Sequence, residues 1–151
     1  MIKVNKGNLL DVTSGIIVHG CNAQGVFGSG VALAVKQKYP IAYDDYRAEY
    51  EYSHNKLFLG TCIKSWVADY LMIISAITQQ YYGRDSKRYV NYAAIAECFK
   101  EAIDTANVYT LDLHFPLIGA GLGGGDWSII EQLINDCDPY DKVSKNLWVL
   151  E

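Results

Sequence analysis

The sequence lacks most of the features by which metalloproteins, secreted proteins and membrane proteins are recognised. Its four cysteines are scattered, with no Cys-x-x-Cys pair and no zinc-like spacing with histidine. We therefore expect reduced, mostly buried cysteines and no bound metal. No apolar run approaches the length of a membrane-spanning helix, and the chain starts with a strand-like pattern instead of a basic-then-apolar leader. These features predict a cytoplasmic protein without membrane contact.

Strong charge of one sign and low-complexity segments are missing as well. Of the 151 residues, 50% are hydrophobic and the formal net charge is −4, which favours neither disorder nor direct affinity for nucleic acid. Only three prolines occur, and no stretch has the composition of a linker. We expect residues 1–151 to form one domain with a real hydrophobic core, and a monomer.

A glycine-rich stretch late in the chain is the strongest feature that is present. Residues 117–127 read Leu-Ile-Gly-Ala-Gly-Leu-Gly-Gly-Gly-Asp-Trp, with five glycines among the seven residues from Gly119 to Gly125. A loop of bare N–H groups that leads into a helix is a ready site for phosphate. A second such loop, Gly-Val-Phe-Gly-Ser-Gly at residues 25–30, lies far upstream. The two loops together suggest a nucleotide-like ligand held between them.

Two familiar phosphate motifs explain these loops poorly. Gly119, Gly121 and Gly124 fit the Gly-x-Gly-x-x-Gly fingerprint, but in dinucleotide-binding folds that loop joins the first strand to the first helix. A cysteine phosphatase needs an arginine in the loop after its thiolate, and the segment from Cys21 to Gly28 contains none. The glycines therefore support phosphate binding without indicating an NAD enzyme or a cysteine phosphatase.

Strand-like and helix-like patterns alternate along the chain. A continuous apolar run at residues 15–19 is typical of a strand covered on both faces. The residues between strands 57–64 and 70–78 predict a hairpin. Ser29 is the predicted N-cap of a helix, and residues 84–88 are predicted to form a polar loop. The pattern predicts an α/β fold with three layers and a mixed sheet, with the ligand beyond the carboxyl ends of the strands. The predicted strands are residues 2–4, 15–19, 57–64, 70–78, 109–117 and 146–150, and the predicted helices are residues 30–38, 41–52, 89–106 and 127–135.

Some side chains near the loops have more than one interpretation. His19 ends a buried strand, where histidine is usually a core residue, yet it is also a candidate acid–base group. Asp126 either orients a water or ribose hydroxyl or caps the helix that starts at Trp127. Tyr81 and Tyr82, just beyond a predicted strand, are candidates for stacking on a base.

Three blocks of residues in this order resemble the macro domain, the ADP-ribose-recognising α/β/α fold, over nearly the whole chain. The blocks are Lys-Gly-Asn-Leu-Leu at residues 6–10, the segment from His-Gly-Cys-Asn at 19–22 through Gly-Ser-Gly-Val-Ala at 28–32, and residues 118–127. The spacing is most similar to the branch of ADP-ribose 1″-phosphate phosphatases and bacterial and phage "Appr-1″-p processing" proteins. The resemblance implies a single macro domain with a central mixed sheet.

The resemblance also implies a role for each matching position. Asn8 replaces the acid that accepts a hydrogen bond from the adenine amino group, and Leu9 offers its backbone N–H to the adenine ring. Asn22 lies beside the distal ribose, and the two glycine loops wrap this ribose and the diphosphate. His19 matches a catalytic histidine, with Asn22 and Asp126 near the reacting phosphate. The implied ligand-binding residues are Asn8, Leu9, Cys21, Asn22, Ala23, Gly28, Ser29, Gly30, Val31, Gly119, Ala120, Gly121, Leu122, Gly123, Gly124 and Gly125.

The implied activity is hydrolysis of ADP-ribose 1″-phosphate to ADP-ribose and phosphate, without metal or cofactor. The ligands are ADP-ribose and ADP-ribose 1″-phosphate. One departure concerns the branch that removes ADP-ribose from glutamate. That branch uses a lysine in the region where this chain reads Ile-Thr-Gln-Gln at residues 77–80, and an acid where this chain has Gly123. That activity is not expected here. The alternatives are hydrolysis of another ADP-ribose conjugate, such as an acetyl ester or a modified macromolecule, and a non-catalytic ADP-ribose-binding module.

Overall fold

The computed structural model describes residues 1–83, 85 and 87–150, which form six strands and four α-helices. The sheet order is β1-β6-β5-β2-β4-β3, in which β3 and β4 pair antiparallel and every other neighbouring pair is parallel. In chain order the elements are β1 (Ile2–Lys6), the 3-10 helix η1 (Leu9–Asp11), β2 (Gly15–Asn22), α1 (Gly30–Lys38), α2 (Pro40–Tyr52), β3 (Cys62–Ala68), β4 (Leu71–Gln79), α3 (Tyr92–Tyr109), β5 (Leu113–Phe115), α4 (Trp127–Asp136) and β6 (Lys145–Val149).

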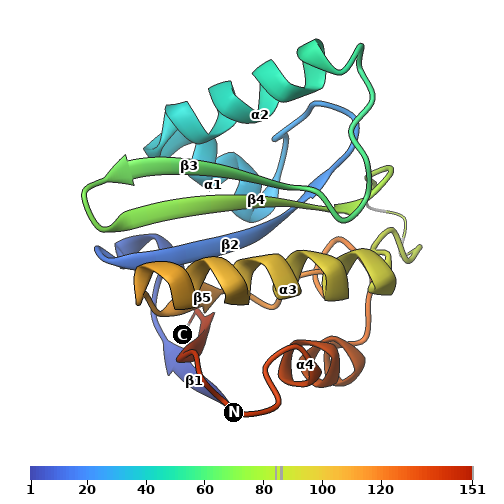
Figure 1. The fold of residues 1–151 in the computed structure, drawn as a ribbon. Helices are drawn as coiled ribbons and strands as arrows, with labels where there is room; N and C mark the ends of the chain where they lie inside the picture. The colour runs from blue at the N-terminus through green and yellow to red at the C-terminus, as the bar shows by residue number, and fades with distance from the viewer. Residues whose placement is uncertain (84, 86, 151) are drawn as a thin grey trace.

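Helices cover both faces of the sheet, with α1 and α2 on one side and α3 and α4 on the other (Figure 1). The central strand β2 supplies both cores because successive side chains of a strand point to opposite faces. Ile16 and Val18 pack under α3 and α4, whereas Ile17 and Cys21 pack under α1 and α2. The predicted three-layer α/β architecture with a mixed sheet is therefore confirmed.

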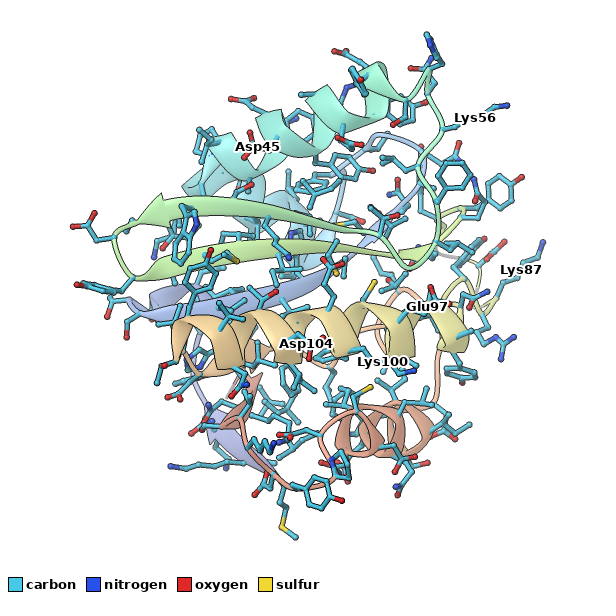
Figure 2. The ribbon with its side chains drawn as sticks, in the orientation of Figure 1. Asp45, Lys56, Lys87, Glu97, Lys100 and Asp104 are labelled. Carbon is cyan, nitrogen blue, oxygen red and sulfur yellow. The ribbon has the colours of Figure 1, made fainter. Side chains whose placement is uncertain are left out.

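The charged residues of the long helix lie on its outer face. Glu97, Lys100 and Asp104 project away from the sheet, whereas Ile95 and Phe99 are fully buried (Figure 2). This spacing of three to four residues gives α3 one apolar stripe. Within the described part of the chain, none of the helices combines the length and the hydropathy that a membrane crossing requires.

The edge strand β3 lies further along the chain than predicted. The strand expected at residues 57–64 runs from Cys62 to Ala68, and the hairpin expected at 65–69 is a turn at Asp69 and Tyr70. Ser65 is polar but buried, because its hydroxyl donates to Asp45 of α2 at 2.6 Å. Ser65, which suggests a turn in the sequence, is therefore a strand residue, and its hydroxyl is hydrogen-bonded to a side chain of a helix.

The boundaries around α3 also differ from the prediction. The helix expected at residues 89–106 begins at Tyr92, because the Asn91 side chain caps it by accepting from the Ala94 N–H. It continues to Tyr109 and ends at Thr110, which has a left-handed φ of 55°. The strand expected at 109–117 therefore shrinks to β5. The helices predicted at 30–38, 41–52 and 127–135 are confirmed within one residue at each end. Residues 84 and 86 of the predicted polar loop lie outside the described residues.

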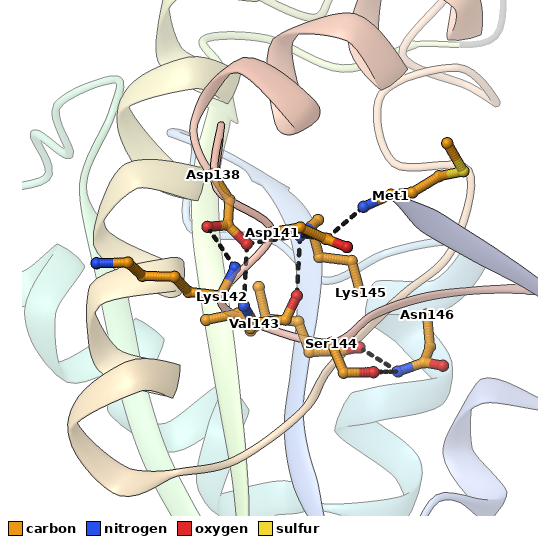
Figure 3. A network of polar contacts seen from close by, with 9 residues as sticks. Met1, Asp138, Asp141, Lys142, Val143, Ser144, Lys145 and Asn146 are labelled. Atoms are coloured by element: carbon orange, nitrogen blue, oxygen red, sulfur yellow. Dashed lines mark hydrogen bonds and ion pairs between the residues drawn. The ribbon is translucent and has the colours of Figure 1, made fainter.

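A buried lysine ties β6 to the turn before it (Figure 3). Lys145 is 1% exposed, and its ammonium group donates to Asp138 at 2.6 Å, to Asp141 at 2.8 Å and to the carbonyl of Val143 at 2.8 Å. The Met1 α-amino group also pairs with Asp141. Burial alone raises the pKa of Asp138, but hydrogen bonds from Lys145 and from two backbone N–H groups outweigh it and lower this pKa.

Replacing Lys145 by methionine leaves Asp138 buried without its cation. Because the uncompensated charge is costly, we expect Lys145→Met to lower the free energy of unfolding at neutral pH by about 3 kcal/mol. Because the pKa of Asp138 is lowered in the folded state, the ionised carboxylate stabilises the fold at pH values above the ordinary carboxyl pKa of about 3.9. This stabilisation is lost as the pH falls through the folded-state pKa. The difference in free energy of unfolding between wild type and Lys145→Met should therefore become smaller at acidic pH. Urea unfolding at several pH values measures it, and an effect no larger than that of the exposed Lys142→Met contradicts the prediction.

Candidate functional site

A cleft of about 620 Å³ lies beyond the carboxyl ends of β2, β4 and β5. Parallel strands end at the same edge of a sheet, so the loops that follow β2 and β5 face each other across this edge. The lining residues are Gly20, Cys21, Asn22, Val26, Gly28, Ser29, Gly30, Val31, Ala32, Thr78, Gln79, Tyr82, Gly83, Pro116, Leu117, Ile118, Gly119, Gly121, Leu122 and Gly123. The sequence prediction of a ligand cleft between two glycine loops agrees with this position.

The loop after β5 divides its backbone N–H groups into two sets. The N–H groups of Ala120, Gly124 and Gly125 donate within the loop, to the carbonyls of Leu117, Gly121 and Gly119 respectively. A second set donates to no acceptor among the described residues, and each of its members lines the cleft. This second set comprises Gly119, Gly121, Leu122 and Gly123. Bare N–H groups collected in one concave turn form an anion-binding site.

The opposite wall is the N-terminus of α1. Ser29 occupies the N-cap position, as predicted, but its side chain makes no capping hydrogen bond. The first N–H groups of α1 are therefore uncapped at the cleft, where the helix dipole favours negative charge. Gly30 has a left-handed φ of 60°, which turns the chain sharply into the helix without steric cost.

The buried hydroxyl of Tyr46 holds the loop that connects β2 to α1. It donates to the carbonyl of Asn22 at 2.6 Å and accepts from the N–H groups of Gly25 at 2.9 Å and Val26 at 3.2 Å. The Asn22 side chain adds a bond from its amide nitrogen to the Val26 carbonyl and one from the Gln24 N–H to its oxygen. Asn22 thus lines the cleft, and its amide also shapes the wall.

A second cavity of about 570 Å³ continues the cleft over β1 and β6. The two cavities share Gly30, Val31, Pro116 and Leu117. The second is mostly apolar and is lined in addition by Gly7, Asn8, Leu9, Leu10, Ala34, Trp148, Val149 and Leu150. The two volumes therefore form one elongated groove, with a polar backbone-lined part and an apolar part.

The predicted acid–base residue His19 is fully buried and is not among the cleft-lining residues. Its Nε2 lies 3.0 Å from Ser75 Oγ, and its ring packs edge-on against Phe27 with centroids 5.2 Å apart. Burial lowers the pKa of His19 to about 4, so the ring is neutral near pH 7. Burial also raises the pKa of the neighbouring Cys21 thiol far above its ordinary value, which leaves no thiolate nucleophile.

Asp126 is the cap of the helix that follows it, which is one of the two interpretations left open by the sequence. It is exposed and caps α4, because its Oδ1 accepts from the N–H of Ser128 at 2.9 Å and from the Ser128 hydroxyl at 2.7 Å. These hydrogen bonds lower the pKa of Asp126. Asp126 is absent from the lining of both cavities, because the cap directs its carboxylate to the helix.

None of the described lining residues of the cleft carries a charged side chain. Its polar side chains are hydroxyls, amides and one thiol, contributed by Ser29, Thr78, Tyr82, Asn22, Gln79 and Cys21. In the part of the chain that the structure describes, no group of three or more histidine, cysteine or acidic residues is placed to hold a metal ion. The arrangement can bind an anion through backbone donors and orient a polyhydroxylated ligand.

Comparison with known proteins identifies the family of this chain. The family model described as Macro domain matches residues 18–134. The chain belongs to the macro domain family.

Relatives of this macro domain match along most of its length. It is 25% identical to the ADP-ribose 1″-phosphate phosphatase of Candida albicans, over 99% of this chain and 100% of the relative. Identity to the ADP-ribose 1″-phosphate phosphatase of Saccharomyces cerevisiae is 26%, over 87% of this chain and 89% of the relative. The solved macrodomain protein from Streptomyces coelicolor superposes with a TM-score of 0.82 at 28% identity, covering 99% of each chain.

Most residues that the sequence assigns to ligand binding line one of the two cavities of the macro domain. Exceptions are Ala23, Ala120, Gly124 and Gly125, which line neither. The last three use their N–H groups inside the loop. The residues in the first cavity are Cys21, Asn22, Gly28, Ser29, Gly30, Val31, Gly119, Gly121, Leu122 and Gly123, and those in the second are Asn8, Leu9, Gly30 and Val31.

Sequence reasoning missed several lining residues at the strand ends. Thr78 and Gln79 end β4 beside the cleft, and the rule that ligands lie beyond the carboxyl ends of parallel strands was a usable signal for them. Trp148 gave no such signal, because its place beside Gly7 depends on pairing between β1 and β6. Of the two stacking candidates, Tyr82 lines the cleft and Tyr81 does not.

Removing the Tyr46 hydroxyl tests its function as the centre of the loop. Tyr46→Phe leaves the N–H groups of Gly25 and Val26 without their acceptor, so we expect the free energy of unfolding to fall by about 1–3 kcal/mol. Tyr43→Phe is the matched control, since the Tyr43 hydroxyl bonds no described residue and its ring packs on the same Phe27. Equal stability of the two variants in thermal unfolding contradicts this function.

Proposed function

We propose that this macro domain binds ADP-ribose and hydrolyses ADP-ribose 1″-phosphate to ADP-ribose and phosphate. One observation carries the proposal: four N–H groups of the Gly119–Gly123 turn, unpaired among the described residues, line the same cleft as the uncapped N-terminus of α1. Two such anion sites on opposite walls suit a diphosphate. The full-length similarity to proteins named ADP-ribose 1″-phosphate phosphatase supports the same ligand.

In this proposal each part of the ligand lies over a different set of strands. The apolar cavity with Trp148 and Leu9 takes the adenine, because a flat apolar base needs apolar and aromatic contacts. Asn8 Oδ1 accepts from the Leu10 N–H at 2.9 Å, and its remaining lone pair and amide hydrogens are available to the base. The glycine turn and α1 take the diphosphate, and the distal ribose lies over the ends of β2 and β4.

The proposed chemistry depends on positioning more than on acid–base groups. Phosphoryl transfer passes through a loose transition state, so alignment of the attacking water and stabilisation of the equatorial oxygens supply most of the catalysis. Water attacks the phosphorus, the bond from phosphorus to the C1″ oxygen breaks, and the water's proton passes to a phosphoryl oxygen. The released anomeric oxygen takes a proton from solvent. No metal or cofactor takes part, and slow turnover is expected.

The three predicted catalytic residues have different functions in this proposal. Asn22 acts at the cleft, as the wall beside the distal ribose. His19 is a positioning residue that joins β2 to β4 through Ser75. Asp126 keeps the glycine loop in place by capping the helix that follows it.

A second candidate function is a binding module for free or attached ADP-ribose. It is favoured by the absence of charged side chains and histidine among the described lining residues, so none of these residues is a candidate general base. The same groove also suits another ADP-ribose conjugate, in which only the leaving group differs. Binding of ADP-ribose without phosphate release from ADP-ribose 1″-phosphate decides for these alternatives.

We also propose that residues 1–151 form one domain that works as a monomer in the cytoplasm. Pairing of β1 with β6 brings both ends of the described chain into one sheet, which supports a single folding unit. The four cysteines are free, as in a reducing compartment. Size-exclusion chromatography with light scattering tests the oligomeric state.

Blocking the glycine turn tests the proposed site. A Cβ at Gly121 has open space around it and no left-handed φ is required there, so Gly121→Glu should fold normally. Its carboxylate enters the diphosphate site, and we expect at least a 100-fold loss of ADP-ribose affinity by calorimetry and loss of phosphate release in EDTA. Asn107→Glu, which adds the same charge on the outside of α3, is the control. Unchanged phosphate release by Gly121→Glu contradicts the site.

The pH profile of phosphate release tests the function of His19. With a pKa of about 4, His19 does not titrate between roughly pH 5.5 and 8, where an ordinary histidine does. The substrate's phosphate itself has a pKa of about 6, so the variant His19→Gln supplies the comparison. We expect the two profiles to have the same shape. An inflection present in the wild type alone would show that His19 is a direct acid–base catalyst.

A further inference from the structure

The indole of Trp148, which lines the apolar cavity, is hydrogen-bonded to a histidine of the neighbouring strand. Its Nε1–H donates to Nδ1 of His114 on β5 at 3.0 Å, and the two ring centroids lie 6.1 Å apart. Both rings are partly buried, and His114 lines neither cavity. The hydrogen bond therefore joins the wall of the groove to a residue that lies outside it.

The backbone approaches each of the two rings closely at a glycine. A Cβ on Gly7 would lie 3.3 Å from Trp148 Cζ3, and a Cβ on Gly15 would lie 2.9 Å from His114 Nε2. Both glycines have a left-handed φ, 144° and 114° respectively, so the chain passes each ring without a side chain. The rings are thus packed against backbone, and the hydrogen bond between them fixes the direction of the indole N–H.

This hydrogen bond requires one protonation state of His114. An indole N–H is a donor only, and an imidazole nitrogen accepts only when it carries no proton. His114 is therefore neutral in this arrangement, with its proton on Nε2. A second proton on Nδ1 would turn the acceptor into a donor that faces the Trp148 N–H. Trp148 Nε1 has no other acceptor in the described part of the chain, so protonation of His114 leaves the indole N–H unpaired.

The surroundings of His114 favour the neutral ring. Burial lowers the pKa of His114, whereas the Asp112 carboxylate and a backbone group of Ser14 oppose this shift. Asp112 is the charged group that acts on the ring among the described residues. On the flanking strands, its partners in register are Ile17 of β2 and Asn146 of β6, and neither titrates. Since the pKa lies below the ordinary histidine value of about 6.5, the ring is neutral above that pH and is protonated in acid.

We propose that neutral His114 is a positioning residue for Trp148, and that protonation of His114 releases the indole and weakens binding of the ligand's base. This inference rests on the proposed function, since it takes the apolar cavity as the adenine site. An indole that has lost its acceptor turns its N–H toward water, and binding of a flat base must then order the ring again. The effect acts through Trp148, because His114 does not line the groove.

The test is calorimetric titration of the full chain with ADP-ribose at about pH 8 and about pH 5, on either side of the ordinary histidine pKa. We expect wild type to bind about 5- to 10-fold more weakly at the lower pH. His114→Asn keeps an oxygen acceptor that does not titrate, so its affinity should be the same at both pH values. His114→Leu has no acceptor and should bind at the higher pH as weakly as wild type does at the lower pH.

The matched control is His54→Asn, which removes an exposed histidine. Asparagine tolerates the left-handed φ of 57° at this position, so the variant should fold normally. It should retain the pH dependence of wild type. Loss of this dependence in His54→Asn, or its persistence in His114→Asn, overturns the assignment to His114.

NMR of the free ¹⁵N-labelled protein observes the pair without a ligand. The ring nitrogens of His114 report its protonation, and the indole N–H signal of Trp148, assigned by its absence in Trp148→Phe, should shift with the same midpoint. An indole signal that does not follow the titration of His114, or a His114 ring that remains neutral at the lower pH, overturns the proposal. If the two signals titrate together but wild type binds no ADP-ribose at either pH, the proposed function fails and the pairing of His114 with Trp148 stands.

Discussion

The site depends on backbone N–H groups that the fold leaves without partners. Secondary structure normally satisfies such groups, and an unpaired buried one costs free energy. Here the N–H groups of Ala120, Gly124 and Gly125 are hydrogen-bonded within the loop after β5. Those of Gly119, Gly121, Leu122 and Gly123 line the cleft and have no acceptor in the described part of the chain. The glycine content serves this division, because Gly119 and Gly124 have the left-handed φ values that the turns require. The proposed ligand site of this macro domain is therefore built from main-chain donors.

Hydrogen bonds from distant parts of the chain hold the two walls in place. The Tyr46 hydroxyl from α2 fixes the loop after β2, and the N–H groups of Tyr89 and Val90 both donate to the carbonyl of Gly123. Donors positioned in advance bind an anion without reorganisation, which is the basis of electrostatic stabilisation in phosphoryl transfer. Core residues that never touch the ligand therefore determine the shape of the site.

The sequence predicted the layers and the two glycine loops, because glycine spacing and apolar periodicity are local signals. Most of the residues that it assigned to ligand binding line the groove, although many other lining residues were missed. It misplaced β3 and the ends of α3, where Ser65 bonds to Asp45 and Asn91 caps the helix through contacts that only the tertiary structure supplies. The sequence also could not determine whether the His19 side chain is buried. His19 looks like an acid–base residue next to Cys21 and Asn22, yet the alternation of β2 turns it into the core under Phe27.

An NMR titration of the ¹⁵N-labelled protein with ADP-ribose tests the account most directly, because it observes each backbone N–H group separately. The account predicts that the largest amide shifts in the glycine loop belong to Gly119, Gly121, Leu122 and Gly123, with small shifts at Gly124 and Gly125, whose N–H groups are already bonded. Saturable binding with large shifts at Gly124 and Gly125 and none at the four free N–H groups would contradict it.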